Sequence, residues 1–124
     1  MTTAIMVISP HDSLRASLES ILHQNGYTVC PGVRETGAFR HALDASETPP
    51  NVILFDYWLS RSLSIDFIRS LKRQRFGVIL MGTHLLGKDV ATLEQVFFLE
   101  KPFTQTELHG AIKVVRPESG LNGD

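Results

Sequence analysis

The stretch Asn51-Val52-Ile53-Leu54-Phe55-Asp56 indicates the fold, because four consecutive apolar residues end on a carboxylate. Two prolines precede the stretch, and the polar segment Ser-Arg-Ser follows at residues 60–62. A short apolar run between such breakers is typical of a strand buried on both faces, as in a parallel sheet covered by helices. Ligands bind at the carboxyl ends of such strands, so Asp56 is expected on the edge that carries a site. An isolated aspartate there is by default a loop residue, so its meaning depends on what the other strand ends supply.

Four further apolar runs predict strands, at residues 4–8, 27–30, 77–81 and 96–99. Segments with helical spacing of apolar residues alternate with them. One follows the first strand and stops at Asn25-Gly26, one covers residues 35–45, and one follows a loop at residues 57–64. A short, weak helix is expected at residues 86–95 and a last helix before Pro117.

Two helix starts have sequence signatures. Ser9 is expected to cap the first helix, with Pro10 at its first position and Asp12 as the capping-box acid. Thr104 and Glu107 have the spacing of a capping box for the last helix.

Five strands alternating with helices imply an α/β fold with a parallel sheet and right-handed crossovers. We predict a flavodoxin-like, doubly wound (βα)5 domain whose five-stranded parallel sheet has the order 2-1-3-4-5. The 124 residues suit a single domain over residues 1–124, with a core at 4–116 and a small polar tail at 117–124.

The amino-acid composition excludes several classes of function and indicates the cellular compartment. Apolar residues are 43% and charged residues 20% of the chain, which is ordinary for a soluble globular protein. The net charge of −1 argues against general electrostatic binding to nucleic acid or an anionic membrane. The single cysteine, Cys30, suits a reducing compartment, and no stretch matches a membrane span or a signal peptide. We therefore expect a cytoplasmic protein.

The predicted strand ends bring an acid, an amine and hydroxyls to one crevice. The residues concerned are Ser9, Asp56, Thr83 and Lys101. These are groups that a phosphoryl or anion site uses.

At this point the chain resembles the receiver domain of bacterial two-component response regulators, over residues 4–116. The resemblance rests on Asp56 after its apolar run and on Lys101-Pro102-Phe103 after the last strand, with Arg15 and the turn Asn25-Gly26-Tyr27 in support. It implies that Asp56 is the phosphoacceptor and that Lys101 contacts the phosphoryl group. It also implies a hydroxyl contact after the fourth strand, a switch aromatic on the fifth, and an acid pair after the first strand that holds Mg²⁺.

This chain departs from that pattern at several positions. The acid pair falls on Ser9 and Pro10, and the switch hydroxyl position falls on Gly82, with Thr83 one residue late. The switch aromatic falls on Phe98. The chain therefore resembles a divergent, atypical receiver.

Loss of both acids should weaken Mg²⁺ strongly, since Asp56 alone would supply a carboxylate. Asp12 is a candidate replacement ligand, although its role as a capping acid is better supported by the sequence. Without the metal, the natural partner of Asp56 is Lys101, whose amine would stabilise the carboxylate by charge and hydrogen bonding.

Three functional hypotheses remain open. The first is a two-component or phosphorelay signalling module that acts by protein–protein contact, with weak or lost Mg²⁺-dependent phosphorylation at Asp56. The second is a conventional phosphoaccepting receiver with an altered metal site that uses Asp12. The third is a small cofactor-binding protein on the same fold, against which the lack of a glycine-rich loop after the first strand counts.

The resemblance also implies a protein partner, which would be a histidine kinase, a phosphotransfer protein or a downstream effector. A homodimer through the fourth helix, fifth strand and last helix is a further option. We expect no enzymatic activity, no cofactor beyond weakly bound Mg²⁺, and no direct contact with nucleic acid or membrane. The third helix carries a basic cluster, for which a solvated face is the favoured interpretation: Arg69, Lys72, Arg73 and Arg75.

Overall fold

A five-stranded parallel sheet forms the centre of the protein, with the strand order β2-β1-β3-β4-β5. The computed structural model describes residues 3–56, 61–82 and 96–116. The strands are β1 (Ala4–Ile8), β2 (Thr28–Val29), β3 (Val52–Asp56), β4 (Gly77–Gly82) and β5 (Val96–Glu100). The predicted α/β fold class and strand order are confirmed.

The three inner strands are buried along their whole length, which explains their unbroken apolar sequences. β3 pairs with both β1 and β4, so its last residue, Asp56, lies opposite Met81. This register brings the carboxyl ends of β1, β3 and β4 to one edge of the sheet.

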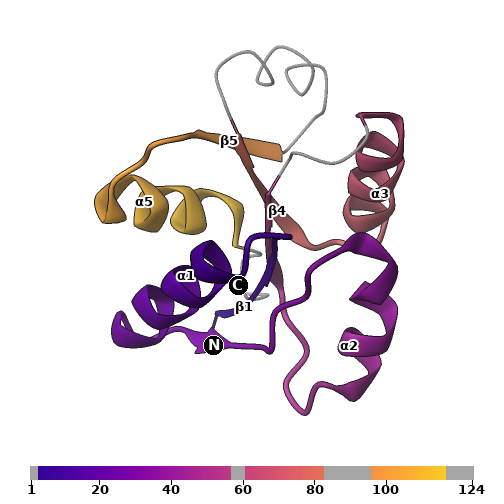
Figure 1. Ribbon diagram of the computed structural model, residues 1–124, viewed down its shortest axis with the longest axis horizontal. Helices are drawn as coiled ribbons and strands as arrows, with labels where there is room; N and C mark the ends of the chain where they lie inside the picture. Colours follow the sequence, from indigo (N-terminus) through magenta and orange to yellow (C-terminus); the bar gives the residue numbers. More distant parts are fainter. Residues whose placement is uncertain (1–2, 57–60, 83–95, 117–124) are drawn as a thin grey trace, which may run out of the picture.

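The helices cover both faces of the sheet (Figure 1). α1 (Asp12–Gln24) and α5 (Gln105–Val115) pack on one face. α2 (Phe39–Ala45), which follows the 3₁₀ turn η1 (Thr36–Ala38), and α3 (Arg61–Arg73) pack on the other. Successive strand residues point to opposite faces, and the core is accordingly two clusters, one on each side of the sheet.

Two helices end in the same backbone motif with different residues at the critical position. After α1, the N–H of Gly26 donates to His23 and that of Tyr27 donates to Leu22. After α3, the N–H of Arg75 donates to Lys72 and that of Phe76 to Leu71. Both patterns are Schellman motifs, which place one residue in the left-handed region. That residue is Gly26 (φ 86°) in the first case and Arg75 (φ 69°) in the second.

The capping prediction is confirmed for one helix and wrong for the other. Thr104 and Glu107 form the predicted capping box of α5. α1 begins at Asp12 with His11 as its N-cap, and no side chain caps it. The Ser9 hydroxyl donates to a distant aspartate and accepts from the His11 N–H, which lies just before the helix, so Ser9 does not cap α1.

Other boundaries also differ from the predictions. α3 begins at Arg61, inside the loop predicted at residues 57–64, because polar residues such as serine and arginine are also compatible with a first helical turn. The predicted helix at residues 86–95 and the tail at 117–124 lie outside the described residues. In the described part of the chain, no helix combines the length and apolar character that crossing a membrane requires.

Candidate functional site

Asp56 is a fully buried carboxylate at the end of the central strand β3. It is one of two buried polar side chains among the described residues, and the other is Ser9. Removing a carboxylate from water is costly unless hydrogen bonds and opposite charge compensate. The groups around Asp56 therefore determine what this site can do.

Each carboxylate oxygen of Asp56 has one donor. The Ser9 hydroxyl donates to Oδ2 at 2.9 Å. The Lys101 ammonium donates to Oδ1 at 2.7 Å and forms an ion pair with it. The predicted pairing of Asp56 with Lys101 is present in the structure. The Lys101 side chain is 30% exposed, while the Asp56 side chain is inaccessible to solvent.

Three strand ends position these groups. Ser9 directly follows β1, Asp56 ends β3, and Lys101 directly follows β5. The Lys101 backbone N–H donates to the carbonyl of Gly82, the last residue of β4, at 2.8 Å, which fixes the chain where it leaves the sheet. The peptide bond from Lys101 to Pro102 is cis.

Ser9 is held by its backbone as well as by its hydroxyl. The hydroxyl oxygen accepts from the His11 N–H at 3.1 Å while its hydrogen goes to Asp56. The Ser9 N–H donates to the Val33 carbonyl at 3.0 Å, and the Ser9 carbonyl accepts from Arg15 Nη1 at 2.7 Å. The orientation of Ser9 is therefore fixed by contacts from three segments.

Asp12 pairs with two arginines and not with the residues around Asp56. Its Oδ1 accepts from Arg15 at 2.7 Å and lies 3.5 Å from Arg34 Nε. The hydrogen bond from Arg15, with the charge of Arg34 next, holds the pKa of Asp12 below its usual value. Its side chain is 66% exposed. The hypothesis that Asp12 replaces a lost metal ligand thus requires it to leave two arginines.

The residues at this edge do not fit Mg²⁺. The ion prefers six oxygen ligands with carboxylates among them. Here both oxygens of the one buried carboxylate already accept hydrogen bonds, one of them from a cation. Pro10 offers no side-chain ligand, and the described parts of the chain contain no group of three histidine, cysteine or acidic residues suited to a metal.

Two other predicted site residues lie apart from this network or outside the described chain. Phe98 is half-buried and packs against the core cluster on the α2 and α3 face. Thr83 lies outside the described residues, and the residue before it, Gly82, ends β4. The structure therefore brings together Ser9, Asp56 and Lys101 from the predicted set.

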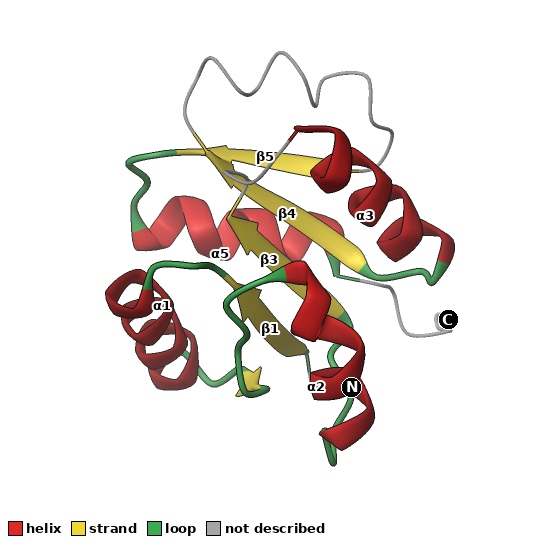
Figure 2. Ribbon diagram, turned by 45° about the vertical axis from the view of Figure 1, so that its right-hand side comes forward, coloured by secondary structure: helices red, strands yellow, loops and turns green. Residues whose placement is uncertain are grey.

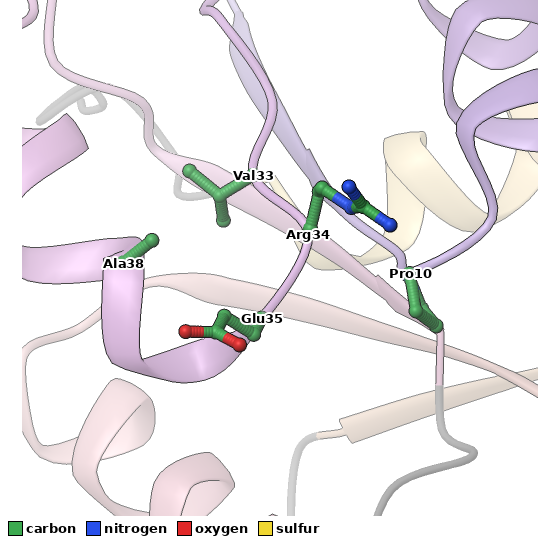
Figure 3. Close-up of a pocket in the computed structure, with 5 residues that line it drawn as sticks. All are labelled: Pro10, Val33, Arg34, Glu35 and Ala38. Atoms are coloured by element: carbon green, nitrogen blue, oxygen red, sulfur yellow. The ribbon is translucent and has the colours of Figure 1, made fainter.

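A pocket of about 470 Å³ lies beside the Ser9 segment (Figure 3). It is lined by Pro10, Val33, Arg34, Glu35 and Ala38. Pro10 contributes an apolar ring to this pocket, at a position where the receiver pattern has an acid. Sequence reasoning missed this pocket, because it forms between two loops that are far apart in the chain.

Sequence reasoning also missed that Ser9 is a hydrogen-bond donor to Asp56. The available signal was the predicted order of the sheet, in which β1 and β3 are neighbours and end at the same edge. Any hydroxyl directly after β1 is then within reach of an acid that ends β3. The cap signature in Ser9 and Pro10 concealed this relationship.

No protein-family model and no curated protein matches the sequence. Solved structures do match the fold. The receiver domain of the PhyR response regulator from Erythrobacter litoralis has 17% identity and a TM-score of 0.73, over 90% of this chain and 88% of that one. The chemotaxis protein CheY4 from Vibrio cholerae has 18% identity and a TM-score of 0.71, over 93% of this chain and 99% of that one.

The anti-anti-sigma factor PhyR from Bartonella quintana has 20% identity and a TM-score of 0.74. The match covers 93% of this chain but 47% of that protein, so this chain spans about half its length. At these identities the likeness establishes a shared fold.

Proposed function

We propose that this chain, which has the receiver-domain fold, is a signalling module that acts through protein contacts and does not depend on Mg²⁺-assisted phosphorylation of Asp56. The observation that carries the proposal is the engagement of both Asp56 oxygens, one by the Ser9 hydroxyl and one by the Lys101 ammonium. This arrangement satisfies the buried carboxylate without a metal.

The argument from chemistry concerns charge. A phosphoryl group carries negative charge, and its transfer to a carboxylate needs cations that offset the repulsion between them. Lys101 supplies one positive charge, but the positions that would hold Mg²⁺ are a serine and a proline. The attacking oxygen would also have to give up a hydrogen bond and become accessible, since Asp56 is fully buried.

The same contacts favour a site held in one state. The Ser9 hydroxyl joins the end of β1 to the end of β3, and Lys101 joins the end of β5 to the same carboxylate. Such a network supports a module whose surface is presented constitutively or is changed by a partner rather than by a phosphoryl group. The alternative of a conventional receiver with Asp12 as a ligand is disfavoured by the pairing of Asp12 with Arg15 and Arg34.

We propose that the chain binds a protein of the signalling pathway in the cytoplasm. This partner would be a histidine kinase, a phosphotransfer protein or a downstream effector. We propose no enzymatic activity of the chain itself. We also propose a homodimer through the fourth helix, β5 and α5, of which the fourth helix lies outside the described residues. Val114 of α5 supports this interface. Among the described residues it is the one large hydrophobic side chain that is exposed, at 69%.

Treatment with Mg²⁺ and acetyl phosphate, followed by intact-mass measurement, tests the proposal. The unmodified chain is expected to gain no phosphoryl group, like the matched Asp56→Asn variant that lacks the acceptor. The double variant Ser9→Asp/Pro10→Asp restores the acid pair and serves as the positive arm. Stoichiometric phosphorylation of the unmodified chain at Asp56 would overturn the proposal.

A further inference from the structure

Three exposed arginines lie at the C-terminal end of α3 and in the turn that follows it: Arg69, Arg73 and Arg75. None of them forms an ion pair within 4.0 Å in the parts of the chain that the structure describes. Asp66, one turn before Arg69 on the same helix, is also exposed and makes no such pair. The three guanidinium groups are therefore available to a partner.

The local energetics of the helix do not explain this cluster. Arg69 and Arg73 are four residues apart, so they lie about 6 Å apart along one helix face, where like charges are unfavourable. The helix dipole favours cations in the last turn, which accounts for Arg73. Lys72 has a structural role, since its ammonium donates to the Phe76 carbonyl at 3.3 Å and burial lowers its pKa. Arg69 makes no ion pair within 4.0 Å among the described residues.

Arg75 occupies a backbone conformation that disfavours it. Its φ of 69° lies in the left-handed region, where a side chain is strained and glycine is preferred. The equivalent position after α1 is occupied by Gly26. A strained residue whose side chain has no ion pair or hydrogen bond among the described residues points to a use for that side chain outside the domain.

We propose that Arg69, Arg73 and Arg75 form a docking surface for an acidic segment of a partner protein. Guanidinium groups bind carboxylates through paired hydrogen bonds, which suits a short peptide or helix with spaced acids. Tight nucleic-acid binding draws on more phosphate contacts than three side chains provide, and the net charge of −1 does not add a wider basic field. Charge complementarity thus favours an acidic protein.

This surface is separate from the Asp56 site. Phe76 and Gly77 lead from α3 into the beginning of β4, whereas Asp56 ends β3. Figure 2 shows the connection from α3 to β4 at the end of the sheet opposite the strand arrowheads. An Asp56→Asn substitution is expected to leave docking unchanged, so failure of this inference is distinguishable from failure of the proposed function.

Binding of the full chain to a fluorescently labelled oligoglutamate peptide, measured by anisotropy at low ionic strength, tests the docking surface. The variants are Arg69→Ala/Arg73→Ala and Arg75→Gly, the second of which relieves backbone strain. The double variant is expected to weaken binding at least about tenfold, and Arg75→Gly to weaken it without lowering the melting temperature. Added salt should weaken binding of the unmodified chain.

The matched control is Arg40→Ala, since Arg40 is also an exposed arginine, on α2, and already pairs with Asp44 at 3.9 Å. It should bind the peptide like the unmodified chain. An unmodified chain that does not bind oligoglutamate would overturn the inference, as would an equal loss in Arg40→Ala. Tighter binding of single-stranded DNA or phosphatidylserine vesicles through the same arginines would also overturn it, in favour of a different class of partner.

Discussion

The hydroxyl of Ser9 and the Oδ2 atom of Asp56 lie 2.9 Å apart, although the two residues are 47 positions apart in the sequence. Both side chains are fully buried. The bond joins the ends of two adjacent parallel strands at the position where the receiver pattern would have a metal ligand. A neutral donor therefore stands in the site where the family pattern places a negative charge.

Removing the Ser9 hydroxyl should destabilise the fold. In Ser9→Ala, Oδ2 of Asp56 keeps its burial but loses its donor, and the free energy of unfolding should fall by about 1–3 kcal/mol. Urea denaturation measures the change. Ser20→Ala on the exposed side of α1 is the matched control and should stay within about 0.5 kcal/mol. Equal effects in the two variants would show that the Ser9 hydrogen bond contributes nothing.

Removing the Lys101 ammonium should cost more. Lys101→Met leaves a buried carboxylate without its counter-charge, and we expect a loss of about 3 kcal/mol, the low end for breaking a buried pair, because Lys101 is 30% exposed. Neutralising both partners in Asp56→Asn/Lys101→Met should recover part of that loss. Thermal or urea unfolding of the two single variants and the double variant gives the coupling energy.

Lys113→Met is the control for Lys101→Met, since Lys113 is an exposed lysine on α5. Its unfolding free energy should change little. If the double variant is no more stable than the sum of the single losses predicts, Asp56 and Lys101 are not coupled, and the ion pair does not hold the site.

The left-handed residue after α3 offers a stabilising substitution. Arg75→Gly removes the strain of a side chain at φ 69° and should raise the free energy of unfolding by about 0.5–1 kcal/mol. The reverse change at the equivalent position, Gly26→Ala, should lower it by about 1 kcal/mol. Chemical denaturation of both variants measures the pair. A destabilised Arg75→Gly variant would indicate that the arginine makes a stabilising contact.

Stability should fall in alkaline solution because of Cys30. Its thiol is 3% exposed and donates weakly to the Thr48 carbonyl, and burial raises its pKa. The unfolded chain then loses the thiol proton at lower pH than the folded chain. The contribution is complete below about pH 8.5, the ordinary thiol value, and is lost as pH rises through the folded pKa.

The unmodified chain should therefore lose more unfolding free energy than Cys30→Ala when urea denaturation is compared below and above about pH 8.5. Other alkaline groups are common to both proteins, so the difference isolates the thiol. Parallel declines in the two proteins would contradict a buried, neutral Cys30.

The sequence predicted the sheet because its inner strands are continuous apolar runs, of which residues 52–55 are the best example. It also predicted that Asp56 pairs with Lys101, because both residues lie at the carboxyl ends of strands, and these ends meet at one edge of the sheet. It failed at Ser9, whose hydroxyl accepts from the His11 N–H and donates to Asp56, 47 positions away in the sequence, instead of capping α1. Helix-capping preferences take no account of this long-range hydrogen bond, which depends on where β3 ends.

Two further features lay beyond sequence reasoning for a similar reason. Nothing in the residue type of Arg75 marks a left-handed position, which the end of α3 imposes. The partners of Asp12 come from its own helix and from the loop after β2, so the orientation of its carboxylate depends on tertiary packing.

The most direct measurement is a Mg²⁺ titration followed at the backbone amide resonances of Ser9, Asp56 and Lys101. We predict no saturable shift in the unmodified chain at millimolar Mg²⁺, because hydrogen bonds already engage both Asp56 oxygens. Ser9→Asp/Pro10→Asp should show saturable shifts at Asp56 and Lys101. Saturable shifts of the same resonances in the unmodified chain would contradict the claim that this site works without a metal.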